Sequence, residues 1–187
     1  MSTAASSINV YTESTPNPAT MKFLVNKLLT NGSIDFATKE SAKTSPFASE
    51  LFKFNFVNGV FFANNFVTIT KTEGAEWADI EALLKEFVKG AVESELKIQE
   101  KEHEAIDFVG TDSEIKIQQI LNDYVRPAVE QDGGAISYKS FIDGVVTVEL
   151  RGSCSGCPSS TITLKSGIEA LLKRMVPEVT EVVSEAL

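Results

Sequence analysis

A strongly acidic segment divides this chain of 187 residues into two parts. Residues 91–112 carry seven acidic side chains against two lysines, whereas residues 1–90 carry nine acidic side chains against eight lysines. Runs of like charge extend in water and resist burial, so the segment is predicted to be a solvated linker. We therefore expect one domain over residues 8–90 and a second over residues 113–187. The only histidine, His103, lies in the linker and is expected to be solvated instead of bound to a metal.

Apolar patterning in the first half predicts a mixed α/β domain. Residues 21–29 alternate as a strand does, and a hairpin is predicted with its turn at Asn64-Asn65, because asparagine tolerates the positive φ of a tight turn. Ser45, which precedes a proline, is typical of the residue that caps the start of a helix. Residues 76–88 have the spacing of an amphipathic helix.

The second half predicts the element order α-β-β-α-β. Its first segment is "DSEIKIQQILNDYVRPAVEQ", and Pro127 is expected to bend this helix near its end. The residues predicted to share one apolar helical face are Ile117, Ile120, Leu121, Tyr124, Val125 and Ala128. The pair Asp143-Gly144 suits a two-residue hairpin turn between two alternating strands. The sequence thus predicts an α+β protein of two small domains, an N-terminal mixed α/β domain and a C-terminal α-β-β-α-β domain.

Charge and composition exclude two classes of partner. The net charge is −9 and only three arginines are present, which argues against a nucleic-acid partner. The longest uncharged stretch, residues 54–70, contains four asparagines that would be costly in hydrocarbon, so no membrane span is predicted. Residues 1–20 contain no lysine or arginine and no apolar stretch of the kind found in signal peptides, which leads us to expect a cytoplasmic location.

The two cysteines of the chain, Cys154 and Cys157, are spaced as CxxC within "GSCSGCPSS". Their small neighbours predict an exposed loop with uncrowded sulfurs, and Pro158 suits the first turn of a helix whose free N–H groups favour anions. Such a position lowers the pKa of a thiol, and Arg151 is expected to add to the effect. In a reducing compartment the pattern indicates a metal site or thiol redox chemistry, with two inert buried thiols as the alternative.

One chain has too few thiols for the common sulfur-ligated metal sites. A tetrahedral zinc or an iron–sulfur cluster usually takes four protein ligands, and this chain offers two cysteines with no histidine nearby. The missing pair must come from a second copy, which a two-fold dimer supplies by symmetry, or from an external thiol. Two other interpretations stay open, a thiol–disulfide redox module and a structural zinc bridged between two chains.

The longest motifs resemble a known family. The stretches "VRPAVEQDGGAISY", "VTVELRGSCSGCPSSTITLKSGIEALL" and "VPEVTEVV" resemble the C-terminal domain of the NifU family of iron–sulfur cluster assembly proteins, over residues 114–187. The stretches "TPNPATMKFLV", "SPFASELF" and "GVFFANNFVTIT" resemble the N-terminal domain of the Nfu proteins, over residues 11–90. Together the two resemblances cover most of the chain.

The resemblance implies a carrier or scaffold instead of an enzyme. It implies that Cys154 and Cys157 are ligands of a [4Fe–4S] cluster shared between the CxxC motifs of two subunits, with a homodimer formed on cluster binding. Upstream cluster assembly proteins and apo iron–sulfur proteins are then the expected partners, and the N-terminal domain is expected to serve docking or targeting. Residues 132–134, "DGG", are interpreted as a helix stop and turn and not as ligands, with a role in shaping the surroundings of the cluster as the alternative.

Overall fold

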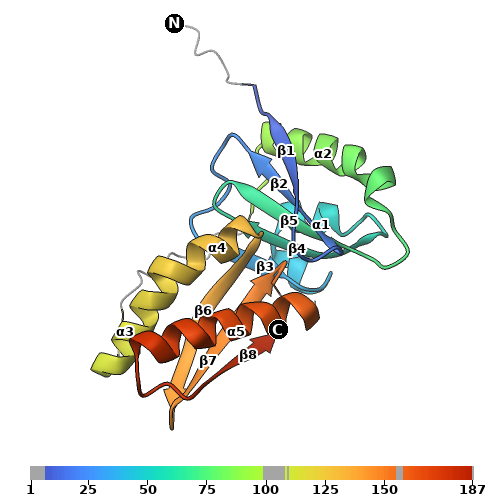
Figure 1. The fold of residues 1–187 in the computed structure, drawn as a ribbon. Helices are drawn as coiled ribbons and strands as arrows, with labels where there is room; N and C mark the ends of the chain where they lie inside the picture. The colour runs from blue at the N-terminus through green and yellow to red at the C-terminus, as the bar shows by residue number, and fades with distance from the viewer. Residues whose placement is uncertain (1–6, 99–107, 109, 155–157, 187) are drawn as a thin grey trace, which may run out of the picture. The chain divides into compact units, whose positions relative to one another are not determined.

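The computed structural model describes residues 7–98, 108, 110–154 and 158–186. Contacts divide the chain into two compact units, Met1–Ser14 with Ala19–Lys101 and Thr15–Pro18 with Glu102–Leu187. Each unit has its own sheet and its own apolar core (Figure 1). The predicted α+β class is confirmed. His103 and the middle of the predicted linker lie outside the described residues.

The first unit is built on an antiparallel sheet whose strand order is β1-β2-β5-β4-β3. Successive side chains of a strand point to opposite faces, and one face of this sheet carries the fully buried Phe23, Phe62 and Ile69. Asn64 has a φ of 46°, which confirms the predicted hairpin turn between two of the strands. The strands are β1 (Val10–Ser14), β2 (Thr20–Val25), β3 (Ser33–Phe36), β4 (Val57–Ala63) and β5 (Phe66–Lys71).

Three helical segments pack against the apolar face of this sheet. They are η1 (Ser41–Thr44), α1 (Pro46–Leu51) and α2 (Trp77–Glu93). The Ser45 hydroxyl oxygen accepts a hydrogen bond of 3.1 Å from the Ala48 N–H, which confirms the predicted helix cap. Helix α2 contributes the buried Leu84 and Val88 to the same core.

Both ends of the predicted linker are helical. Helix α2 continues to Glu93 and buries Ala91 and Val92 against the first core, because its apolar stripe repeats at helical spacing beyond the predicted boundary. Helix α3 begins at Asp112. The predicted linker of residues 91–112 is therefore too long at both ends, and its solvated middle stays a prediction.

The second unit follows the predicted order α-β-β-α-β. Its sheet has the strand order β6-β7-β8, with β6 and β7 antiparallel and β7 and β8 parallel. Alternate residues of β7, Val146, Val148 and Leu150, are buried beneath the helices, which lie on one face of the sheet (Figure 1). The elements are α3 (Asp112–Ile120), η2 (Leu121–Val125), α4 (Arg126–Gln131), β6 (Gly134–Ile142), β7 (Val145–Gly152), α5 (Pro158–Met175) and β8 (Glu181–Ala186).

The bend predicted at Pro127 takes the form of a π-helical segment. Proline has no N–H to donate and its ring displaces the carbonyl one turn earlier, and here the helix widens so that the Arg126 N–H donates to the Leu121 oxygen. Val125 is buried as predicted, but beyond it the wider turn shifts the buried stripe by one residue, from the predicted Ala128 to Val129. The prediction that Tyr124 is buried is wrong, and its side chain is 61% exposed.

Within the described part of the chain, the search for a membrane-spanning helix finds none of sufficient length and apolarity.

Candidate functional site

Cys154 lies two residues beyond the end of β7, in the loop that leads to α5. It is only 6% exposed, and the neighbouring Ser153 is 2% exposed. The prediction of an exposed, uncrowded sulfur is therefore wrong for Cys154. The other predicted ligand, Cys157, lies outside the described residues. The structure accordingly places one of the two thiols, at the carboxyl end of a central strand.

The backbone of Gly134, at the start of β6, forms the floor beneath Cys154. A Cβ atom added to Gly134 would lie 2.6 Å from the Cys154 sulfur and 2.8 Å from the Arg151 carbonyl oxygen, both closer than Cβ contacts allow. Only glycine leaves room for this sulfur. The sequence offered the "DGG" motif as a signal, and this contact supports the alternative interpretation, in which the motif shapes the surroundings of Cys154.

The same turn holds the residue before the cysteine. The Ser153 hydroxyl donates to the Asp132 carbonyl oxygen, and the Ser153 N–H donates to the Gly133 carbonyl oxygen at 3.2 Å. The Ser153 oxygen lies 3.9 Å from the Cys154 sulfur. Asn17, in the short loop that contacts assign to this unit, donates to the Ser153 carbonyl oxygen at 3.2 Å. These bonds fix the backbone that carries Cys154.

Burial keeps the Cys154 thiol protonated at neutral pH. Desolvation raises the pKa of Cys154 to about 11, the Ser153 hydroxyl opposes this shift, and the Asp132 carboxylate adds to it. The expectation of a lowered pKa is wrong for this residue, because desolvation raises the pKa more than the Ser153 hydroxyl lowers it. A metal centre that binds here displaces the proton.

The positive charge expected from Arg151 is already paired with a carboxylate. Its guanidinium donates to the Glu149 Oε2 atom at 2.7 Å, and the Lys139 ammonium lies 3.3 Å from the same oxygen. Burial disfavours the charged form of Glu149, but its bonds with Arg151 and then Lys139 outweigh burial and lower the pKa. Arg151 therefore neutralises a buried carboxylate instead of adding free charge at Cys154.

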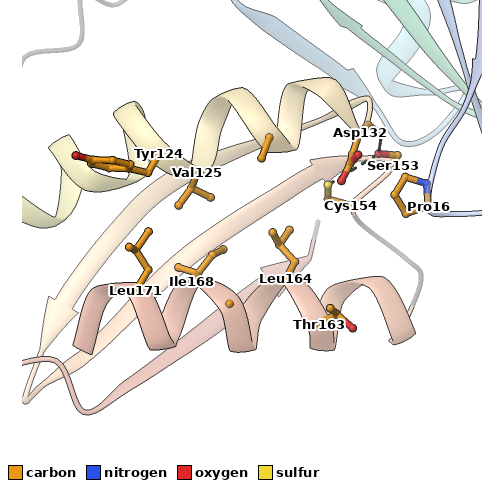
Figure 2. Close-up of a pocket in the computed structure, with 12 residues that line it drawn as sticks. Pro16, Tyr124, Val125, Asp132, Ser153, Cys154, Thr163, Leu164, Ile168 and Leu171 are labelled. Carbon is orange, nitrogen blue, oxygen red and sulfur yellow. Dashed lines mark hydrogen bonds between the residues drawn. The ribbon is translucent and has the colours of Figure 1, made fainter. Parts of the chain in front are cut away.

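A groove with a cavity volume of about 630 Å³ runs from Cys154 along helix α5. Figure 2 shows that Cys154, Ser153 and Asp132 lie at one end and Tyr124 at the other. Apolar side chains of the π segment and of α5 line the space between, chiefly Val125, Leu164, Ile168 and Leu171. Among the described residues, no three metal-binding side chains gather at one point.

Comparison with known proteins matches both units to domain families. Residues 117–183 match the family model described as "NifU-like domain", and residues 10–95 match "Scaffold protein Nfu/NifU N terminal". A human protein named "NFU1 iron-sulfur cluster scaffold homolog, mitochondrial" is 39% identical over 179 residues, which cover 91% of this chain and 69% of the human protein. The chain belongs to the Nfu family.

Other members of the Nfu family with the same name occur in flies. The Drosophila erecta protein is 37% identical over 182 residues, which cover 94% of this chain and 64% of the fly protein. The chain thus spans somewhat less than two thirds of that relative's length. A solution NMR structure of a NifU-like protein from Saccharomyces cerevisiae is 18% identical, with a TM-score of 0.45 over 56% of this chain and 93% of that chain.

The predicted cytoplasmic location is wrong, because these Nfu relatives are named mitochondrial. The expectation depended on a pattern that residues 1–20 lack, and the lack of a pattern does not identify a compartment.

Proposed function

We propose that this chain carries an iron–sulfur cluster on Cys154 and Cys157 and delivers it to apo iron–sulfur proteins. The observation that carries the proposal is the built site around Cys154: a buried thiol seated on glycine backbone, at the start of an apolar groove, in a domain of the NifU-like family. The names of the related scaffold proteins support it. We expect no turnover of a small substrate.

The cargo is a [4Fe–4S] cluster shared by two copies of the chain. Such a cluster is commonly held by four thiolates, and each chain contains two cysteines. Cys154 and Cys157 of both copies then complete the ligand set, with a two-fold axis passing between the two loops.

Delivery proceeds by exchange of thiolate ligands. Each bond between iron and Cys154 or Cys157 that breaks is replaced by a bond between that iron and a cysteine of the acceptor. The proton released by the acceptor thiol ends on the freed cysteine, and no electron is transferred. Four exchanges move the whole cluster.

Following the names of its relatives, we place this activity in mitochondria. The partners are upstream assembly proteins that supply the cluster and apo-proteins that accept it, and we assign docking to the N-terminal domain. Residues 8–90 and 113–187 remain our proposed domains, with the boundary residues adjusted to α2 and α3 as described above.

The proposal is tested by anaerobic reconstitution with iron and sulfide, followed by absorption spectroscopy and metal analysis. The wild type is expected to turn brown and to bind iron and sulfide in equal amounts. Cys154→Ala and Cys157→Ala are each expected to abolish loading. Alanine is preferred to serine at position 154, because it places no hydroxyl in a buried site.

The same samples separate the two alternatives. A colourless protein whose folding follows added zinc would support the structural zinc bridge. A reversible disulfide between Cys154 and Cys157, formed without cluster loading, would support the redox module. Unchanged far-ultraviolet circular dichroism in both alanine variants shows that lost loading is not lost folding.

A further inference from the structure

The groove beside Cys154 leaves apolar surface uncovered. Its walls come from the π segment and from α5, and Gly167 of α5 forms a gap in one wall, because a Cβ atom there would have no neighbour within 4 Å. At the far end Tyr124 is 61% exposed. An apolar groove and an exposed aromatic ring gain no stabilisation from burial until a partner covers them, so this surface is expected to bind another molecule.

The protruding ring and the groove belong to one surface. The π segment turns Val125 into the groove and leaves Tyr124 exposed beside it (Figure 2). When two copies meet across a two-fold axis, the same surface faces itself, so a protrusion of each copy can enter the recess of the other. A ring next to a recess therefore has the shape of a self-complementary interface.

We propose that this groove is the contact surface between two copies of the chain, and that Tyr124 of each copy packs into the groove of its partner. The inference rests on the proposed function and specifies the surface that brings the two pairs of cysteines together. It assigns the groove to a second copy instead of an acceptor protein.

Two observations favour a second copy. The groove begins at Cys154, so a chain that covers it lies next to the site that lacks two thiols. The second observation is the low charge of the groove. Two copies that each carry a net charge of −9 repel one another over most of their surface. Among the described residues that line the groove, however, only Asp132 is charged. This surface therefore permits close approach at low electrostatic cost.

Filling the groove from within tests the proposal without damaging the fold. Gly167→Leu places a side chain in the open space of the groove, and leucine also favours the helix more than glycine does. Gly90→Leu is the matched control, because Gly90 lies in α2 of the first unit and a Cβ atom there also has no neighbour within 4 Å. Sedimentation velocity under anaerobic conditions measures dimerisation of each variant after reconstitution with iron and sulfide.

We expect the dissociation constant of the reconstituted dimer to rise at least tenfold in Gly167→Leu and to stay at the wild-type value in Gly90→Leu. Neither variant is expected to melt below the wild type. A second pair of variants tests the protrusion: Tyr124→Ser is expected to weaken the dimer roughly tenfold, as loss of an aromatic side chain buried in an interface does. Its control is Ile142→Ser, because Ile142 is similarly exposed at 64% but lies at the tip of the β6–β7 hairpin.

The outcomes separate this inference from the function on which it rests. A wild type that loads no cluster, or loads a complete cluster as a monomer, overturns the proposed function and the interface with it. A wild-type dimer that holds the cluster, with Gly167→Leu and Tyr124→Ser dimerising equally well, overturns the interface alone. Variants that dimerise normally but deliver the cluster more slowly to an apo-protein would assign the groove to the acceptor and also overturn it.

Discussion

The core of the first unit and the groove of the second place aromatic rings in different environments. In the first unit phenylalanine rings pack in a closed core, where the centroid of Phe62 lies 5.1 Å from that of Phe47 and 6.1 Å from that of Phe36. In the second unit Tyr124 is exposed beside an open groove. A closed aromatic core stabilises its own chain, whereas an open apolar surface needs a partner. This difference agrees with the proposal that the cluster and the second copy bind at the second unit.

The largest effect is expected from opening the closed core. Phe62 is fully buried, and Phe62→Ala is expected to destabilise the first unit by about 3–5 kcal/mol because it leaves a cavity. Chemical denaturation followed by circular dichroism measures the loss. Iron and sulfide per chain after reconstitution should stay at the wild-type level, and a loss of loading in the folded variant would contradict the division of roles.

A smaller loss of stability, with a complete loss of loading, is expected at the floor of the thiol site. Gly134→Ala forces a methyl group against the Cys154 sulfur and the Arg151 carbonyl oxygen, which is expected to cost about 1–3 kcal/mol through overpacking. Iron content and the melting temperature measure the two effects. Gly74→Ala is the matched control, because a Cβ atom on Gly74 meets nothing within 4 Å. Normal loading of Gly134→Ala would disprove the role of this contact.

Removing the charge of Glu149 is expected to lower the free energy of unfolding by about 1–3 kcal/mol, since it leaves Arg151 and Lys139 without their buried hydrogen-bond partner. The pKa of Glu149 is lowered in the folded chain, so its stabilising contribution is fully present above the unfolded pKa and is lost as pH falls through the folded pKa. Denaturation of the wild type and Glu149→Gln at several pH values measures this. The difference between them should shrink below the unfolded pKa of glutamate, at a pH of about 4.3. A difference that grows on acidification would refute the assignment.

The smallest expected effects come from the two helix glycines with free space around them. Gly90→Ala and Gly167→Ala are each expected to stabilise the chain by about 0.5–1 kcal/mol, because alanine restricts the unfolded chain and favours a helix. Thermal unfolding measures both. If Gly167→Ala destabilised the second unit while Gly90→Ala did not, the space around Gly167 would be smaller than the groove requires.

Local patterns predicted the fold well. The element order of the second unit, the cap at Ser45 and the turn at Asn64 depend on spacing and on residues with distinct backbone preferences, which a single sequence displays directly. The predicted end of α2 is too early, because the acidic residues after position 90 were interpreted as a linker although the apolar stripe of the helix continues to Val92.

The site was predicted less fully than the fold. The spacing of Cys154 and Cys157 predicted a metal or redox site, and this stays a prediction. Burial of Cys154 was not predicted, because it depends on Gly134, which is 20 positions earlier in the chain and adjacent only through the β6–β7 pairing. Tyr124 was misplaced because regular helical spacing has no allowance for the extra residue of a π turn. The sequence pattern therefore predicts neither contacts between distant segments nor irregular helical turns.

Native mass spectrometry of reconstituted protein tests the central claim most directly. Equal amounts of unlabelled and ¹⁵N-labelled chain are mixed before anaerobic reconstitution, with no other thiol present. The account predicts one [4Fe–4S] cluster per two chains, with the mixed pair of labelled and unlabelled chains as the most abundant cluster-bearing species. A complete cluster on a single chain would contradict it.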